Sequence, residues 1–198
     1  MKDKIKKGTI DSAFHELADA IDRGIVHADI FYFFGDLSRV KGLQEQAEKY
    51  LLAALRFQSF SPYVYYSLGL LHSTLHNWKK CAAFFSLFLN ILETSESHFE
   101  LSKALKEMHA YTESLAHLTR AIEMDPYCPI YYVYRAELLE EEGLNGFAQK
   151  DYAEIEQNDP RFLVRYYQSC ETGGKKVKEF IGKVRNASLS RGYDSLLY

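Results

Sequence analysis

A repeat of about 34 residues is the feature that most constrains how this chain can fold. Small side chains recur at steps of 34, 34, 33 and 34 residues, at Ala13, Ala47, Cys81, Ser114 and Ala148. Four positions after each of them stands a large side chain, at Leu17, Leu51, Phe85, Leu118 and Tyr152. Three positions further the series continues with Ala20, Ala54, Phe88, Ala121 and Ile155. Side chains three and four positions apart share one face of an α-helix, so each triplet predicts a helix with one contact stripe.

A second series lies upstream of the last four of these helices and predicts a partner for each of the four. It consists of Phe31-x-x-Phe34-Gly35, Tyr65-x-x-Leu68-Gly69, His98-x-x-Leu101-Ser102 and Tyr132-x-x-Arg135-Ala136. The small residue that ends each group lets two helices approach closely, and the large residue of the next helix fills the space between units. One helix pair cannot bury its apolar stripe alone, whereas a stack of pairs can. The sequence therefore predicts an all-α array of antiparallel helix pairs.

In these slots the chain resembles the tetratricopeptide repeat family, whose unit follows the pattern W-x2-L-G-x2-Y, A-x3-F and P. The most similar segment runs from Ala116 to Pro126, and Asn158-Asp159-Pro160 closes the next unit in the same way. Further family-like positions are the expected turn residues Gly8, Gly42 and Gly143 and the aromatic residues Trp78 and Tyr111. The chain departs from the pattern at Ser38, His72, Arg135, Ser59 and Glu93.

The resemblance covers roughly residues 9–160, and it implies a right-handed superhelical solenoid that binds other proteins. We expect a single array over residues 1–186, with a half unit at 9–25 and units at about 28–59, 62–93, 95–126 and 129–160. Residues 161–186 are expected to supply closing helices, because Val177, Phe180, Ile181 and Val184 form an amphipathic stripe. Residues 187–198 show no periodicity and are expected to form a flexible tail.

Composition limits the environment and the partners of the chain. It carries 24 Lys and Arg against 27 Asp and Glu, a net charge of -3 that gives no electrostatic basis for binding nucleic acid. Three cysteines in no paired spacing favour a reducing, cytoplasmic location. The most apolar stretch, Ala82 to Leu92, is far shorter than the roughly 20 residues that span a membrane. We therefore expect no membrane insertion.

Motifs for catalysis are not found in the sequence. The patterns G-x-S-x-G, GxxxxGK[ST] and GxGxxG do not occur, which removes the usual support for serine chemistry or phosphate binding. His72 and His76 have a spacing that could hold a metal on a helix, but no supporting third ligand accompanies them. The expectation is a protein that is no enzyme and has no catalytic residue, no metal and no cofactor.

The face of the array formed by the first helix of each pair is the predicted binding site. Residues one position after the motif slots point there, about 100° around the helix. The predicted groove residues are Tyr32, Tyr63, Tyr66, Leu70, Phe99, Lys103, Ile130, Val133 and Glu137. Tyrosine offers a large apolar area and a polar tip, which suits a peptide or helical segment of another protein. The alternative is that some of these rings pack against neighbouring units or against the C-terminal helix.

Two further surfaces are candidates for contacts. Between Cys81 and Leu92 the apolar residues Phe84, Leu87, Leu89 and Ile91 exceed what the motif needs. This helix is therefore a candidate for self-association or for cover by an adjacent unit or by the tail. The tail residues Leu196, Leu197 and Tyr198 are a candidate for docking into the groove of a neighbouring molecule.

The sequence favours a protein–protein interaction scaffold of adaptor type. Lys103 and Lys106 are present, but the asparagines that complete a carboxylate clamp in co-chaperones of this family are absent, which disfavours that role. Two alternatives remain open. One is a chaperone similar to those of type III secretion, which shield hydrophobic translocator segments; the other is a self-associating structural or assembly subunit, hence a homo-oligomer.

Overall fold

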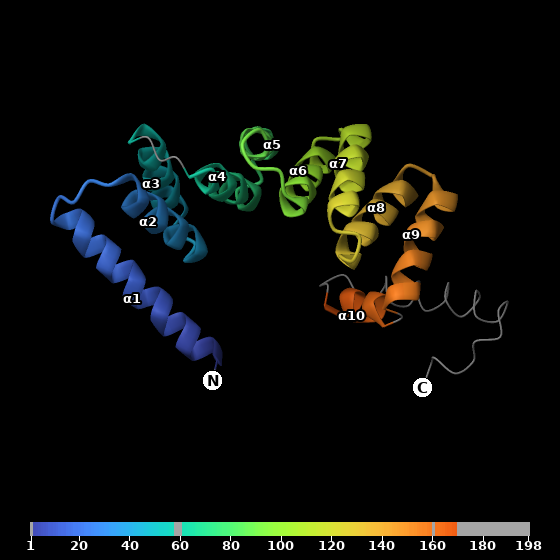
Figure 1. The fold of residues 1–198 in the computed structure, drawn as a ribbon, viewed down its shortest axis with the longest axis horizontal. Coiled ribbons are helices and arrows are strands. Elements are labelled where there is room, and N and C mark those ends of the chain that lie inside the picture. The colour runs from blue at the N-terminus through green and yellow to red at the C-terminus, as the bar shows by residue number, and fades with distance from the viewer. Residues whose placement is uncertain (1, 58–60, 160, 170–198) are drawn as a thin grey trace. The chain divides into compact units, whose positions relative to one another are not determined.

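The computed structural model of the chain describes residues 2–57, 61–159 and 161–169, and these residues form ten α-helices (Figure 1). The bounds are α1 Lys2–Asp22, α2 Ala28–Val40, α3 Gln44–Arg56, α4 Tyr63–Thr74, α5 Trp78–Leu89, α6 Ser95–Glu107, α7 Tyr111–Met124, α8 Pro129–Glu141, α9 Asn145–Asn158 and α10 Phe162–Ser169. The predicted all-α class is confirmed.

The chain divides into two compact units, Met1–Asp125 and Pro126–Tyr198, called unit 1 and unit 2 below. Unit 1 contains α1 to α7, and unit 2 contains α8 to α10. The expected continuity of one array through residue 186 stays a prediction, and most of the expected closing segment and the whole tail lie outside the described residues.

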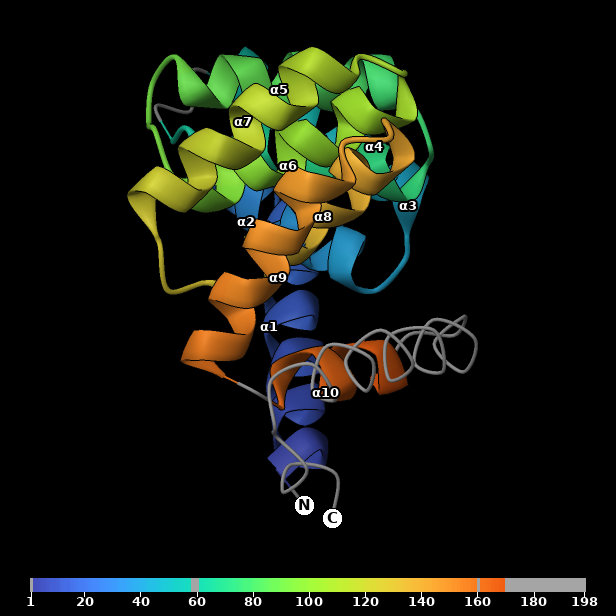
Figure 2. The ribbon, with the colours of Figure 1, turned by 90° about the vertical axis from the view of Figure 1, so that its right-hand side faces the viewer.

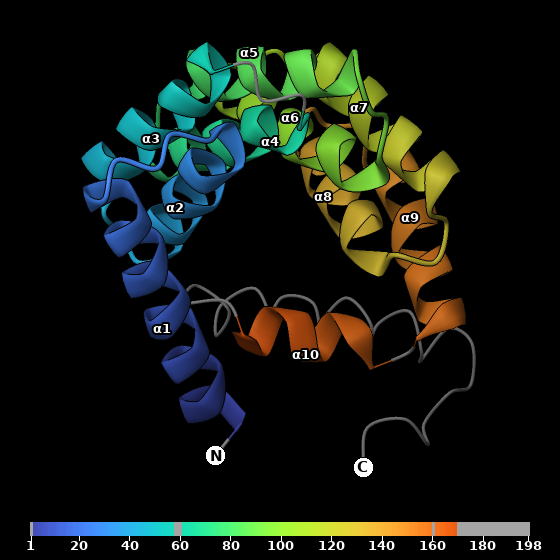
Figure 3. The same ribbon diagram turned by 60° about the vertical axis from the view of Figure 1, so that its left-hand side comes forward.

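Each 34-residue period forms one antiparallel hairpin. In unit 1, α2 packs against α3, α4 against α5 and α6 against α7. The first helices α2, α4 and α6 lie side by side, and the second helices α3, α5 and α7 lie along the outer side of that row (Figure 3). In unit 2, α8 packs against α9, and α10 crosses the end of α9 (Figure 2).

Two glycines let the helices of a hairpin approach closely, as the small slots predict. A Cβ atom on Gly35 would lie 2.8 Å from Cγ and 2.9 Å from the backbone nitrogen of Leu51. A Cβ atom on Gly69 would lie 2.8 Å from the ring of Phe85. Leu51 and Phe85 are both fully buried, so the large side chain of each second helix occupies the space that the glycine leaves.

The turn between the two helices of a hairpin contains one residue in the left-handed backbone region. This residue is Gly42 (φ 76°) or Gly143 (φ 75°) in two hairpins, and His76 (φ 53°) or His109 (φ 60°) in the other two. The prediction of a turn at Gly8 is wrong, because Gly8 lies inside the continuous helix α1. A single glycine lowers helix stability by only about 1 kcal/mol, which the rest of a 21-residue helix outweighs.

Candidate interaction surface

The first helices of unit 1 carry the candidate surface, which we call the first-helix face. It consists of Tyr32, Asp36 and Arg39 on α2, Tyr63, Tyr66, Ser67 and Leu70 on α4, and Glu100 and Lys103 on α6. Tyr63 is the most open of the predicted tyrosines, with 49% of its surface exposed. Tyr32, Tyr66, Leu70 and Lys103 are half-buried. The face therefore combines one accessible aromatic ring with neighbouring side chains that are partly buried in the hairpins.

The tyrosines of α4 rest on the second helix of their own hairpin. The ring centroids of Tyr63 and Phe88 are 5.8 Å apart, and those of Tyr66 and Phe88 are 5.3 Å apart. Tyr66 also meets Phe85 edge-on, at 5.4 Å between centroids. Tyr66 thus supports the interior of the hairpin as well as its surface, whereas Tyr63 keeps half of its area open.

Both half-buried tyrosines keep their protons near neutral pH. Burial raises the pKa of Tyr32, and the neighbouring carboxylate of Asp36 adds to the effect. Burial likewise raises the pKa of Tyr66, and the carboxylates of Glu100 and Glu96 on α6 add to it. An un-ionised phenol can donate one hydrogen bond and accept others, so these side chains suit the backbone of a bound peptide.

The charged groups of this face are paired within it. The Oδ1 atom of Asp36 accepts hydrogen bonds from Ser67 Oγ at 2.8 Å and from Arg39 Nε at 2.9 Å, which links α2 to α4. On α6, Lys103 Nζ donates to Glu100 at 2.7 Å and lies 5.0 Å from the ring centre of Phe99. Because each charge has a nearby counter-charge, the face suits a neutral or apolar segment better than an acidic one.

The structure places two predicted groove residues in the interior. Val133 has no exposed surface, and Phe99 has 9%. They stand three positions before Ala136 and Ser102, as Tyr32 and Tyr66 stand before Gly35 and Gly69, so this position lies beside the hairpin interface in every unit. There the two tyrosines are half-buried, whereas Val133 and Phe99 are buried. The prediction of these two as contact residues is therefore wrong for this conformation. Ile130 and Glu137 on α8 are half-buried within unit 2.

The apolar surplus between Cys81 and Leu92 divides into two groups. Phe84 stacks on the ring of His72 at 5.4 Å, and Leu89 packs against the cluster around Phe85. Leu87 and Ile91 stay open, with 44% and 59% of their surface exposed. The first pair explains part of the surplus as core packing. The tail residues named from the sequence lie outside the described residues.

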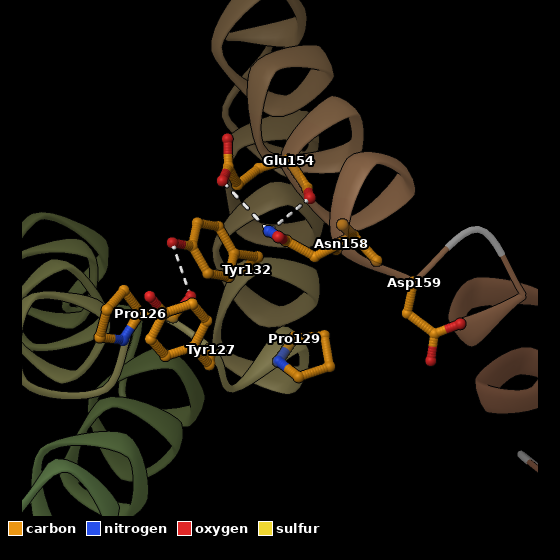
Figure 4. Close-up of a pocket in the computed structure, with 8 residues that line it drawn as sticks. Pro126, Tyr127, Pro129, Tyr132, Glu154, Asn158 and Asp159 are labelled. Carbon is orange, nitrogen blue, oxygen red and sulfur yellow. Dashed lines mark hydrogen bonds between the residues drawn. The ribbon is translucent and has the colours of Figure 1, made fainter.

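Unit 2 contains a pocket of about 280 Å³ at the junction of the α8 start and the α9 end (Figure 4). Its lining residues are Pro126, Tyr127, Pro129, Tyr132, Glu154, Ile155, Asn158 and Asp159. The hydroxyl of Tyr132 donates to the carbonyl of Pro126 at 3.2 Å, and Asn158 Nδ2 donates to Glu154 O at 3.0 Å (Figure 4). The first bond fixes the turn before α8, and the second lies within the last turn of α9.

The two histidines with metal-compatible spacing have different environments. His72 is buried on α4, whereas His76 is exposed in the following turn and meets Trp78 edge-on at 5.4 Å. In the described part of the chain, no group of three or more His, Cys, Asp or Glu side chains is arranged to hold a metal ion. Among these same residues, none of the helices has the length and apolar character needed to cross a membrane.

Comparison with known proteins identifies the fold. No protein-family model and no curated protein sequence matches the chain. The crystal structure of MamA matches with a TM-score of 0.73 at 16% identity, over 80% of this chain and 94% of that one. A MamA fragment, residues 41 to the end, from Desulfovibrio magneticus RS-1 matches with a TM-score of 0.73 at 11% identity, over 81% and 92% of the two chains.

A third similar structure is described as a tetratricopeptide-repeat (TPR) protein. YrrB, described as a TPR protein with an unusual peptide-binding site, matches with a TM-score of 0.68 at 19% identity, over 84% of this chain and 91% of that one. The chain therefore has the tetratricopeptide-repeat fold, as its 34-residue pattern predicts.

Proposed function

We propose that this protein is a non-catalytic interaction scaffold that binds a neutral, partly apolar segment of another protein on the first-helix face of unit 1. The observation that carries the proposal is the open ring of Tyr63 beside the half-buried tyrosines Tyr32 and Tyr66. Tyrosine is enriched at protein interfaces because it offers apolar area and a hydrogen-bonding tip together. YrrB, a TPR protein with a peptide-binding site, supports peptide binding as a use of this fold.

The paired charges of the face support the choice of a neutral segment. Asp36 is already bonded to Arg39 and Ser67, and Glu100 to Lys103. A partner carboxylate would have to compete with these bonds, whereas an apolar side chain would only cover them. Covering one anchor side chain contributes roughly 1.5–3 kcal/mol before ordering costs.

Short peptides selected from a random display library against the full-length chain provide the test. We expect neutral sequences with aromatic or aliphatic anchors to be enriched. Tyr63→Ala should weaken their binding about tenfold or more in isothermal titration, because the open half of the ring is lost from the contact. Tyr66→Ala is less suitable, because Tyr66 contacts both Phe85 and Phe88 and its loss would leave a cavity.

The matched control is Phe147→Ala, which removes an aromatic side chain that is 58% exposed on the second helix α9. It should leave peptide binding unchanged. Equal losses for both variants, or selected peptides that bind Tyr63→Ala as tightly as the parent chain, would contradict the assignment of this face.

The same selection separates the alternatives named from the sequence. A chaperone of the type III secretion kind would enrich long, strongly apolar segments. A self-associating subunit would sediment as an oligomer, and peptides that bind the first-helix face would leave that oligomer intact unless the same face forms it.

A further inference from the structure

The slot residues of α1 are more open than those of every other second helix in unit 1. In α3, α5 and α7 the corresponding side chains are at most 2% exposed; they are Ala47, Leu51, Ala54, Cys81, Phe85, Phe88, Ser114, Leu118 and Ala121. In α1 the equivalent residues Ala13, Leu17 and Ala20 are only half-buried. The main packing partner of α1 within unit 1 is α2, which follows it in sequence (Figure 3). Helix α1 therefore has the contact stripe of a second helix, but among the described helices of unit 1 its main partner is α2, which does not occupy the place of a first helix.

A fourth position on each second helix, three residues after its small residue, shows which contacts the first helix of the pair provides. We call this position the fourth slot. In each complete hairpin this residue contacts the first helix of its own pair. Tyr50 meets Phe34 edge-on at 4.8 Å, and Phe84 stacks on His72 at 5.4 Å.

The other two hairpins pair polar groups at the same slot. The Nδ1 atoms of His117 and His98 are 2.8 Å apart. Asp151 accepts two hydrogen bonds from Arg135, at 2.8 and 2.6 Å. The fourth slot is thus matched chemically across every hairpin that the structure describes.

In α1 the fourth slot holds Glu16, which is exposed and accepts a hydrogen bond from Ser12 of the same helix at 3.1 Å. The side of α1 toward α2 is already engaged. Phe14 stacks on Phe34 at 4.8 Å between ring centroids, and Asp11 pairs with Lys41. The stripe that includes Glu16 and Leu17 therefore points to a partner other than α2.

We propose that this stripe of α1 binds an amphipathic helix of a partner protein, which completes α1 as the first helix completes each other hairpin. Two features of the partner helix follow from the other hairpins of the chain. It carries a small residue opposite Leu17, because Gly35 and Gly69 leave no room for a Cβ atom against Leu51 and Phe85. It carries a basic residue immediately before that small residue, because Arg135 occupies this position opposite the carboxylate of Asp151. This surface lies outside the first-helix face and goes beyond the proposed function.

A pair of synthetic peptides tests the proposal on the full-length chain. The first has the sequence of residues 94–108, which is α6 with its capping Thr94 and has Leu101 and Ser102 in the two decisive slots. The second carries Leu101→Arg. Titration by fluorescence anisotropy should show both binding weakly, because an isolated short helix is only partly formed. The arginine peptide should bind about three- to fivefold more tightly, as a partly exposed ion pair would give.

Two substitutions in the chain and one in the peptide test whether the peptides bind at Glu16 and Leu17. Glu16→Lys should reverse the order of the two peptides, and Leu17→Glu should remove binding of both. A Ser102→Leu peptide should lose binding about tenfold or more, because its side chain would overlap Leu17. His15→Lys, one position away on an exposed part of α1, is the matched control and should change neither affinity nor order.

Each variant should keep the helix content and the melting temperature of the parent chain in circular dichroism, so that a loss of binding reports the contact and not unfolding. The proposal is overturned if the peptides do not bind, if Glu16→Lys leaves their order unchanged, or if Leu17→Glu binds them normally. It is also overturned if the chain forms concentration-dependent oligomers that Leu17→Glu dissolves, because a second copy would then be the occupant of the stripe.

Discussion

At the scale of single residues, the repeat predicts the close contacts well and the turn chemistry poorly. Gly35 and Gly69 follow directly from their places in the small slots, and the structure puts each against the predicted large residue. His76 and His109 could not be predicted as left-handed turn residues, because glycine is the usual signal for that conformation. Each of these histidines meets an aromatic ring two positions later, Trp78 or Tyr111, which is a local compensation that periodicity does not report.

The first prediction concerns the small slots. Gly35→Ala should lower the free energy of unfolding of unit 1 by about 1–3 kcal/mol, because its Cβ atom would overlap Leu51. Trp78, the single tryptophan of the chain, lies in unit 1 and reports the urea transition by fluorescence. Gly8→Ala is the control: nothing lies within 4 Å of its Cβ position, so this variant should lose no stability. Equal stability of the two variants would count against close packing at Gly35.

The second prediction concerns the buried ring of His72. Neither ring nitrogen hydrogen-bonds to another described residue, and the approach of Nε2 to Glu48 Oε1, at 3.5 Å, is too long for a hydrogen bond. A buried N–H without a partner costs about 1–3 kcal/mol. His72→Phe keeps the stacking on Phe84 and should raise the free energy of unfolding by about 1 kcal/mol in the same urea assay. A destabilised variant would show that His72 has a polar partner in solution.

At the scale of helices, the hairpins share one backbone geometry and differ in the chemistry that joins them. Arg135 departs from the family pattern in sequence, and the structure explains why: its guanidinium binds Asp151 across the hairpin of α8 and α9. The pair could not be foreseen from either residue alone, because Asp151 lies outside the three slots that define the repeat. In the α6–α7 hairpin, Glu93 accepts from His98 Nε2–H at 3.1 Å, which leaves His98 Nδ1 to accept from His117.

The third prediction tests the ion pair of unit 2. Asp151 has 7% and Arg135 has 21% of its side-chain surface exposed. Asp151→Ala should destabilise unit 2 by about 3 kcal/mol, because it leaves a mostly buried guanidinium without its carboxylate. The double variant Arg135→Leu with Asp151→Leu should regain most of that loss, because an apolar pair removes the uncompensated charge. Thermal unfolding followed by circular dichroism measures both, and a double variant no more stable than Asp151→Ala would refute the explanation.

At the scale of the whole molecule, the sequence predicts the order and pairing of the helices but only part of the binding surface. The period fixes which residues face the interior of a hairpin. The period does not fix how exposed the predicted groove residues are: Tyr66 is half-buried, whereas Val133, at the same place in its own repeat, is fully buried. The half-open stripe of α1 was equally invisible in the sequence, because its slots have the same residue types as the buried ones.

The fourth prediction is a pH dependence of unit 1. Burial lowers the pKa of His72 and of His117 below the ordinary value of 6.5. The unfolded chain therefore binds more protons than the folded one as the pH falls below about 6.5, and stability should decrease in that direction. Urea midpoints from Trp78 fluorescence should fall between about pH 7.5 and pH 5, and His72→Phe should flatten the slope. A midpoint that rises on acidification would contradict the buried, neutral state of these rings.

A second loss of stability should follow at more acidic pH. Arg120 and His98 hold the pKa of the Glu93 carboxyl at about 2, well below its usual value of 4.5. Its contribution to stability is present above pH 4.5 and is lost as the pH falls toward 2. Glu93→Gln should remove this second step and leave the histidine step above it in place.

The matched pairs at the fourth slot also bear on how the chain avoids folding errors. Helices of similar length and period invite exchange of partners between repeats, a common failure of repeat proteins. An exchange that set Asp151 against Phe34 would bury a carboxylate against an apolar ring. An exchange that set His117 against Arg135 would leave the guanidinium without its carboxylate partner. The polar pairs thereby penalise some wrong pairings, whereas an exchange between the ring contacts of Tyr50 and Phe84 carries no such penalty.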